Sequence, residues 1–177
     1  MRKFIASIVA IFALGIMSSG CMRAISKELR AQVQERIDLA QVRENPSDFM
    51  GKMVIWGGVI VEAKNLKEGT LIEIVQKPIS VEERPRNVDQ SAGRFLALYK
   101  GYLDAAIYSA GRDVTVAGRL KEMKTKPLGE IEYSYPVISA EEVYLWPPKT
   151  EKKYPEYPFW IYPGYYHYPH RMDPWYW

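Results

Sequence analysis

An uncharged apolar run opens the chain and leads into small residues and a cysteine. Phe4–Met17 carries no charged side chain, follows Arg2 and Lys3, and precedes Ser18–Cys21. A basic start, a short apolar core and small residues before a cleavage point are the parts of a secretory signal peptide. The run is shorter than the roughly 20 residues needed to cross a bilayer. We therefore expect residues 1–20 to be a signal peptide that is removed.

The next stretch has the apolar spacing of a helix. Residues 22–27 are expected to be a short tether, and Ser26 can cap the first turn that follows. Apolar side chains then recur on one face among charged residues and Gln, at Leu29, Val33, Ile37 and Ala40. This spacing predicts one helix over Ser26–Arg43 that packs on a barrel or sheet. A helix lying on a membrane surface is the alternative.

From Lys52 the pattern changes to short runs rich in β-branched and aromatic residues, separated by turns. Asn45-Pro46 is expected to end the helix and start a short turn that Gly51 closes. The Gly57-Gly58 pair indicates a bulge or a sharp coil in the first strand. A short helix or turn is expected over Gly101–Tyr108. The runs expected to form strands are 53–61, 70–75, 93–99, 112–121, 130–138 and 140–146.

This order of elements predicts a mainly β fold. We expect a small five- to six-stranded OB-like barrel with an N-terminal helix and a short helix between strands 3 and 4. A β-sandwich is the alternative, although it usually has more strands. The expected organisation is a signal peptide at 1–20, a lipidated tether and N-terminal helix at 21–51, the β-barrel domain at 52–147, and a Pro/aromatic-rich tail at 148–177.

Composition leaves few kinds of chemistry open. The chain has 24 basic and 21 acidic residues, and loss of Arg2 and Lys3 lowers the net charge from +3 to +1. Such a balance gives no sign of a nucleic-acid partner. The single cysteine excludes an intramolecular disulfide, and both histidines, His167 and His170, lie in the tail. A barrel without Cys or His has no triad and almost no way to hold zinc.

We therefore expect no catalytic residues, no cofactor and no metal site. An enzyme that uses carboxylates alone is the minor alternative.

Many short motifs, in a consistent order over about residues 21–146, resemble those of the Slp family. These are outer-membrane lipoproteins of Gram-negative bacteria, first described as starvation-inducible. The resemblance implies a β-barrel-like domain facing the periplasm, an association with stationary phase and acid stress, and no agreed biochemical activity. The motifs are Gln41–Pro46, Gly51–Ile60, Gln76–Ile79, Ser91–Leu96, Gly101–Asp104, Tyr108–Arg112, Val114–Gly118, Gly129–Glu130, Tyr133–Val137 and Tyr144–Trp146.

Cys21 is the one residue to which the resemblance assigns a role. The segment before it resembles the lipobox of bacterial lipoproteins, in which the thiol receives a diacylglyceryl group before cleavage. Gly20 and Cys21 fit this pattern, whereas Ser18 stands where it usually has Leu. Met22, in place of an Asp, indicates the outer membrane. A buried free thiol in an N-terminal core helix is the alternative.

A few other side chains are candidates for binding. Trp56 beside the Gly pair could form a ligand-facing platform, although a Trp in such a strand more often belongs to the core. Arg94 and Arg112 each follow a Gly and could bind an anion. Salt bridges at the barrel rim to Asp104 or Asp113 are the simpler interpretation. In the tail, His167 and His170 could bind a metal weakly, or could titrate in mild acid.

The tail is the most unusual stretch. Residues 154–177 contain seven Tyr, three Trp, one Phe and five Pro. Proline disfavours helix and regular sheet, while Tyr and Trp suit boundaries between water and an apolar phase. The tail is expected to lie on the membrane surface or a partner protein, on cell-wall glycan, or on its own barrel.

Together these features predict an outer-membrane lipoprotein, held by a lipid on Cys21, with its domain on the periplasmic side. Its expected role is structural or interactive within the envelope, under starvation or acid stress. Other envelope proteins or peptidoglycan are the expected partners, and nucleic acid is not. The alternative is a ligand-binding module for cell-wall glycan or a small anion, acting through the barrel face and aromatic tail.

Overall fold

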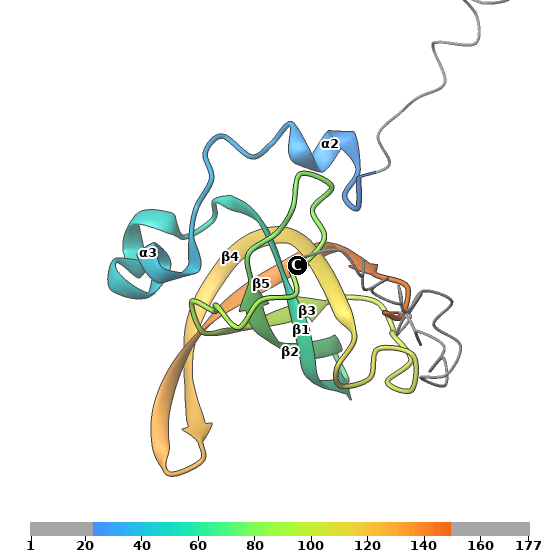
Figure 1. The fold of residues 1–177 in the computed structure, drawn as a ribbon. Helices are drawn as coiled ribbons and strands as arrows, with labels where there is room; N and C mark the ends of the chain where they lie inside the picture. Colours follow the sequence, from blue (N-terminus) through green and yellow to red (C-terminus); the bar gives the residue numbers. More distant parts are fainter. Residues whose placement is uncertain (1–22, 150–177) are drawn as a thin grey trace, which may run out of the picture.

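Five strands close into a barrel in the computed structural model, which describes residues 23–149 (Figure 1). In spatial order the strands run β1-β2-β3-β5-β4, with β4 pairing back onto β1. Neighbouring strands are antiparallel except β3 and β5, which are parallel. The predicted OB-like barrel is confirmed, and the sandwich is excluded. The strands are β1 Met53–Leu66, β2 Gly69–Lys77, β3 Arg94–Tyr99, β4 Asp113–Leu128 and β5 Ile131–Leu145.

The last two strands are longer than the sequence pattern suggested. Runs 130–138 and 140–146 were expected to be separate strands, but they form the single strand β5. Its register against β4 shifts between Ala117 and Gly118 and again between Leu120 and Glu122. Bulges of this kind bend a strand and increase its twist. One long hairpin can therefore both close the barrel and project beyond it, as its lower end does in Figure 1.

The Gly57-Gly58 pair lets neighbouring parts of the chain approach β1 closely. The bulge expected at this pair lies further along β1, between Ile60 and Glu62. A Cβ built on Gly58 would lie 2.0 Å from the carbonyl oxygen of Val75 in β2. Only a residue without a side chain fits there, so the pair lets β1 coil tightly against its neighbour.

The barrel interior is filled by apolar side chains from all five strands. Trp56 and Phe95 meet edge to face with ring centroids 5.3 Å apart. Full burial of a large apolar side chain stabilises a fold by about 1.5–3 kcal/mol. The N-terminal segment adds three buried side chains to this same core, Ile37, Leu39 and Val42.

The predicted single helix over Ser26–Arg43 is wrong. The segment forms two short helices, α2 at Lys27–Arg30 and α3 at Leu39–Glu44, followed by the 3-10 helix η2 at Pro46–Phe49. Leu29 packs on a small cluster outside the barrel, whereas Ile37 enters the main core. One straight helix could not place Leu29 and Ile37 in these two different clusters. The carbonyl of Ile37 accepts a hydrogen bond from the Trp56 side chain and not from a helical amide. Ala24 and Ile25 are buried, so the predicted tether over 22–27 is also shorter than expected.

The short helix expected between strands 3 and 4 is a single turn. The carbonyl of Asp104 accepts hydrogen bonds from the amides of Ile107 and Tyr108, and its side chain accepts one from Ala106. Thr70 Oγ1 accepts the amide of Leu103 at 2.9 Å. A Ser/Thr/Asp side chain that binds nearby amides competes with helix formation, which explains the difference. Within residues 23–149, no helix has the length and apolar character needed to cross a membrane.

Candidate functional site

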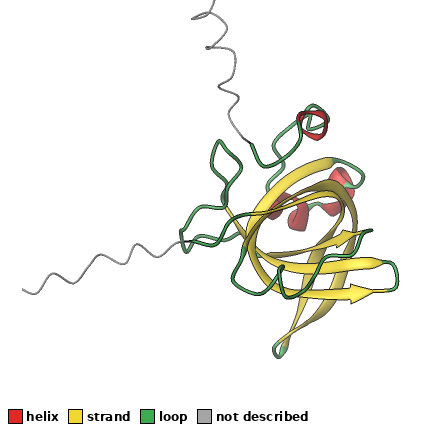
Figure 2. Ribbon diagram, turned by 90° about the vertical axis from the view of Figure 1, so that its right-hand side faces the viewer, coloured by secondary structure: helices red, strands yellow, loops and turns green. Residues whose placement is uncertain are grey.

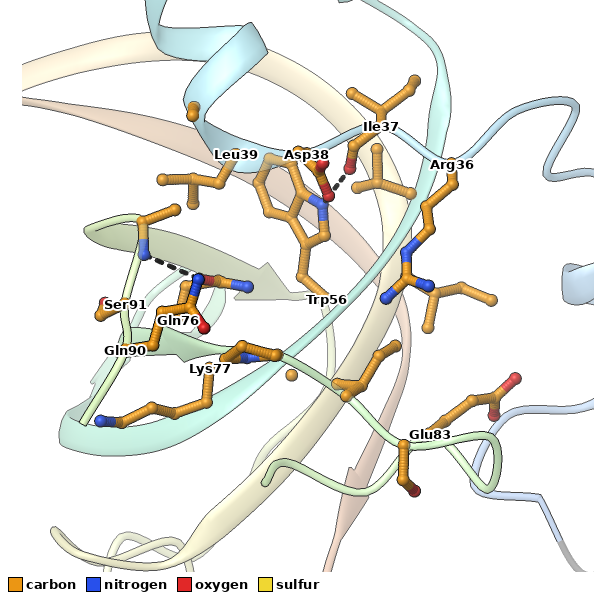
Figure 3. A pocket seen from close by; sticks show the side chains of 18 of the residues that line it. Arg36, Ile37, Asp38, Leu39, Trp56, Gln76, Lys77, Glu83, Gln90 and Ser91 are labelled. Carbon is orange, nitrogen blue, oxygen red and sulfur yellow. Dashed lines mark hydrogen bonds between the residues drawn. The ribbon is translucent and has the colours of Figure 1, made fainter. Parts of the chain in front are cut away.

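A cleft of about 790 Å³ lies between the barrel and the chain segments that flank β1 and β2 (Figure 3). The described chain before β1, residues 23–52, is called the arm. One wall of the cleft is arm segment 33–40, the other is the loop 77–92, and the floor is the part of β1 around Trp56. At Gly57 a Cβ would lie 2.5 Å from a methyl group of Ile79. The glycine thus lets the loop close one end of the cleft floor.

Trp56 belongs to the core, as the simpler interpretation held. The residue is only 4% exposed, and its indole Nε1 donates a hydrogen bond to the carbonyl oxygen of Ile37 at 2.7 Å. Figure 3 shows the ring turned toward the arm, with this hydrogen bond running from the indole nitrogen to Ile37. Trp56 therefore attaches the arm to the barrel, and it offers no open face on which a ligand could stack.

The polar lining of the cleft comes from the arm and the loop. In Figure 3 the Arg36 side chain extends into the cleft, with Gln90 and Ser91 on the opposite side. Arg36 is exposed and makes no ion pair with any residue in the described part of the chain. The Nζ of Lys77 donates a hydrogen bond to the carbonyl oxygen of Val88 at 2.7 Å. The cleft therefore presents two cations that make no ion pair within the described residues, Arg36 and Lys77. It also presents amide and hydroxyl groups and the carboxylates of Glu35, Asp38 and Glu83, a mixture that suits hydroxyl-rich ligands.

Arg94 is committed to an ion pair, though with a different carboxylate from those expected. Its guanidinium lies 2.8 Å from Glu73, and Lys126 lies 2.9 Å from the other oxygen of the same carboxylate. Burial alone would raise the pKa of Glu73, but hydrogen bonds from Lys126 and Arg94 outweigh it and hold that pKa below its ordinary value. Burial, and then the charge of Glu73, raise the pKa of Tyr135. This cluster closes on itself and leaves no cation free for an anion.

Arg112 binds carbonyl groups. It donates hydrogen bonds to the carbonyl oxygens of Ile107 and Trp146, so the expected salt bridge to Asp104 or Asp113 is absent among the described residues. The carboxylate of Asp113 is 2% exposed and lies 3.1 Å from Lys149 and 4.0 Å from Arg84. These contacts fix the end of the described chain against the barrel.

A segment we call the clamp loop, residues 78–88, binds both ends of the described chain. Glu83 is 7% exposed, and its carboxylate accepts the amide of Ile25 at 2.9 Å. The next residue, Arg84, donates to the carbonyl of Pro147 at 3.4 Å and lies over the ring of Trp146. Glu83 has a φ of 70°, and its carbonyl oxygen accepts a hydrogen bond from the Thr115 hydroxyl. The backbone of the loop therefore fixes the direction of the Glu83 side chain.

Two of these residues, Arg36 and Glu83, escaped prediction from the sequence. Arg36 falls inside a stretch that reads as the polar face of a helix. Glu83 is one of several charges in a loop expected to be polar and solvated. No local pattern marks a carboxylate whose partner is an amide 58 residues away.

The sequence model of the outer membrane lipoprotein Slp family matches residues 19–177. The chain belongs to this family. The resemblance carried by the short motifs is thereby confirmed, and this Slp-family protein is located in the outer membrane.

Two relatives show how far the likeness extends. An uncharacterized protein of Haemophilus influenzae is 31% identical over 126 residues, covering 69% of this chain and 68% of that protein. The outer membrane protein Slp of Escherichia coli is 24% identical over 138 residues, covering 77% and 72% respectively. The crystal structure of a small single-stranded DNA-binding protein from Streptomyces coelicolor aligns with 14% identity and a TM-score of 0.32, over 52% of this chain and 92% of that one. That alignment is too loose to carry a conclusion.

Several candidates named from the sequence lie outside the described residues. These are the signal peptide, the proposed lipidation site Cys21, both histidines and nearly all of the aromatic tail. Within residues 23–149, no group of three or more His, Cys, Asp or Glu side chains is arranged to hold a metal ion.

Proposed function

We propose that the protein is a non-enzymatic lipoprotein, anchored through an acylated Cys21, with a structural or interaction role in the envelope. The observation that carries the proposal is the run Ser18-Ser-Gly-Cys21 directly before a segment that docks on the barrel at Ala24. Mature lipoproteins of this kind carry three acyl chains, and stable anchoring needs more than one. Membership of the outer membrane lipoprotein Slp family supports an anchored position in the envelope.

Labelling of growing cells with a palmitate analogue tests the anchor. The wild-type protein should carry the label and sediment with membranes. The Cys21→Ala variant should carry no label and leave the membrane fraction. A wild-type protein without label would contradict the proposal, and the abundance of both proteins is measured so that loss by degradation is not mistaken for loss of acylation.

We further propose that the protein acts under starvation or acid stress, with the barrel facing the periplasm. Cells lacking the gene should survive starvation or acid challenge less well, and the wild-type gene should restore survival. The Cys21→Ala gene should restore it poorly, because the barrel would no longer be held at the membrane. Equal survival of all strains would contradict this role.

A second candidate function rests on the cleft. Arg36, which makes no ion pair within the described residues, lies opposite Gln90 and Ser91, and this arrangement would suit a cell-wall glycan strand or a small anion. Full-length protein should co-sediment with peptidoglycan, and Arg36→Ala should weaken this. Arg86→Ala is the matched control, because Arg86 is exposed and lies outside the cleft. No co-sedimentation of the wild-type protein would exclude the glycan, leaving titration with inorganic phosphate to test the anion.

A further inference from the structure

The N-terminal arm packs on the barrel from Ala24 onward. Ala24 and Ile25 are 5% and 1% exposed and form a buried cluster with Ala117 of β4. The carboxylate of Glu83 accepts the amide of Ile25, and that of Glu142 accepts the amide of Ser26 at 3.0 Å. The start of the arm is therefore fixed relative to the barrel by apolar packing and two charge-assisted hydrogen bonds.

Little free chain remains between the proposed lipid and this fixed point. Three residue steps separate Cys21 from Ala24, which allows a separation of at most about 11 Å between their Cα atoms when fully extended. The whole polar region on one side of a bilayer is only about 5–8 Å thick. A lipid on Cys21 would thus hold the surface around Ala24 within about 11 Å of the lipidated residue, within or directly next to the headgroup layer.

An exposed apolar side chain lies at this same place. Val81, at the tip of the clamp loop, is 73% exposed and stands two residues from Glu83, which holds Ile25. The pKa of Glu82 is lowered mainly by hydrogen bonds from the Ser80 side chain and from the backbone, and to a smaller extent by the charge of Arg23, which lies near the tip. A single exposed apolar side chain is common on protein surfaces and indicates nothing by itself. Its place matters here, because a lipid on Cys21 would bring a bilayer surface next to this loop tip.

The other end of the described chain leaves from the same side. Arg84 holds Pro147, and Lys149 donates to Asn87 at 3.4 Å, so the clamp loop binds the start of the tail as well. Figure 2 shows both ends on one side of the barrel, away from the β4–β5 turn. The tail that follows is rich in Tyr and Trp, the residues enriched where a membrane meets water.

We infer that this side of the domain, which we call the anchor face, lies directly against the phospholipid surface. It consists of Arg23–Lys27, the clamp-loop tip Val81–Glu82, and Pro147–Lys149. The inference rests on the proposed acylation of Cys21 and adds an orientation to it. In this orientation the β4–β5 turn points away from the membrane, where the long hairpin can reach other components of the envelope.

Charge contributes little to this contact. Arg23 and Lys27 are exposed cations, Lys149 is paired with Asp113 at 3.1 Å, and the carboxylates of Glu82 and of Glu28, which adjoins the face, are exposed beside them. Binding should therefore depend on acyl chains and apolar contact, and it should change little when the salt concentration is raised.

Site-specific fluorescence in vesicles tests the orientation. Cys21 is the only cysteine, so once it is acylated a thiol introduced elsewhere is the single free one. Full-length Val81→Cys and Ile131→Cys proteins are produced in cells, labelled with an environment-sensitive dye, and reconstituted in vesicles of phosphatidylethanolamine with some phosphatidylglycerol. Ile131 is the matched control, because it is 61% exposed and adjoins the β4–β5 turn.

The expected result is a blue shift and quenching by a lipid-borne quencher at position 81, with neither at position 131. If both proteins float with the vesicles but position 81 behaves like position 131, or if position 131 alone is quenched, the orientation is wrong. If the proteins do not float and mass spectrometry finds no acyl groups, the acylation of Cys21 has failed, and the inference fails with it. The mass and flotation data therefore separate the two kinds of failure.

Discussion

Replacement of Glu83 by Ala should release the N-terminal arm and leave the barrel folded. In the wild-type structure the Glu83 carboxylate accepts the Ile25 amide at 2.9 Å and lies 3.7 Å from Arg30, which itself donates to the Ile25 carbonyl at 3.1 Å. Both backbone groups of Ile25 thus depend on this pair. The Ile25 residue is 1% exposed, so water cannot replace the lost acceptor while the arm stays docked.

The size of the effect follows from these contacts. A hydrogen bond to a charged group contributes about 1.5–3 kcal/mol. The ion pair with the partly exposed Arg30 adds at most about 1 kcal/mol. A loss of about 2–3 kcal/mol from the docked state corresponds to an increase in the open population of roughly 30- to 150-fold. Since the arm opens locally, amide hydrogen exchange over residues 24–30 should accelerate by a similar factor.

Hydrogen-exchange mass spectrometry measures this directly, with two control variants. Glu83→Gln keeps a carbonyl acceptor for Ile25 and should show a smaller acceleration. Glu82→Ala removes the exposed neighbouring charge and should show almost none. Exchange in β1 to β5 should stay at the wild-type rate in all three. If the arm of Glu83→Ala exchanges as slowly as in the wild type, or if arm and barrel accelerate together, the clamp does not act as described.

Three further outcomes are expected. Trp56→Phe removes the indole donor to Ile37 and should lower the free energy of unfolding by about 1–3 kcal/mol, measured by urea denaturation. Gly58→Ala places a methyl group on the Val75 carbonyl and should cost about 1–3 kcal/mol in the same assay, because β1 and β2 must separate. Glu73→Gln should lower the melting temperature at neutral pH. Because the folded-state pKa of Glu73 lies below its ordinary 4.5, its contribution is complete above that pH and disappears as pH falls through the lowered value. The variant and wild-type melting temperatures should therefore converge in strong acid, and a constant difference would contradict the role assigned to this carboxylate.

The barrel was predictable because its strands carry their own pattern. Val114, Val116 and Leu120 face the core as the alternation predicts, and so do Val54 and Trp56 in the β-branched run of β1. Thr115 and Ala117, on the other face of β4, are also buried, because the clamp loop and the arm cover them. The assignment of Trp56 to the core follows from the same pattern. The hydrogen bond from Trp56 to Ile37 could not be predicted in this way, because Ile37 lies in a segment whose apolar spacing predicts a continuous helix.

The arm and the ion pairs were not predictable for a common physical reason. The stripe from Leu29 to Ile37 fits a helix, but its two ends pack against different clusters, and tertiary packing overrides a weak local preference. Arg94 was expected to pair with Asp104 or Asp113 and instead binds Glu73, whose approach depends on how β2 lies beside β3. Which charged side chains pair depends on how the strands lie side by side in the closed barrel, and no pattern in the linear sequence indicates it.

The way the barrel closes also fixes the order in which the chain can fold. β1 pairs with β4 across about half the domain, and β3 pairs with β5 in parallel, so neither contact forms until most of the chain is available. The arm docks on Ala117 of β4 and Glu142 of β5, although it is made first. Such non-local contacts form late in folding. The segment that follows Cys21 therefore has no docking surface until the last strand is in place, so the acylation proposed for Cys21 would precede docking of the arm.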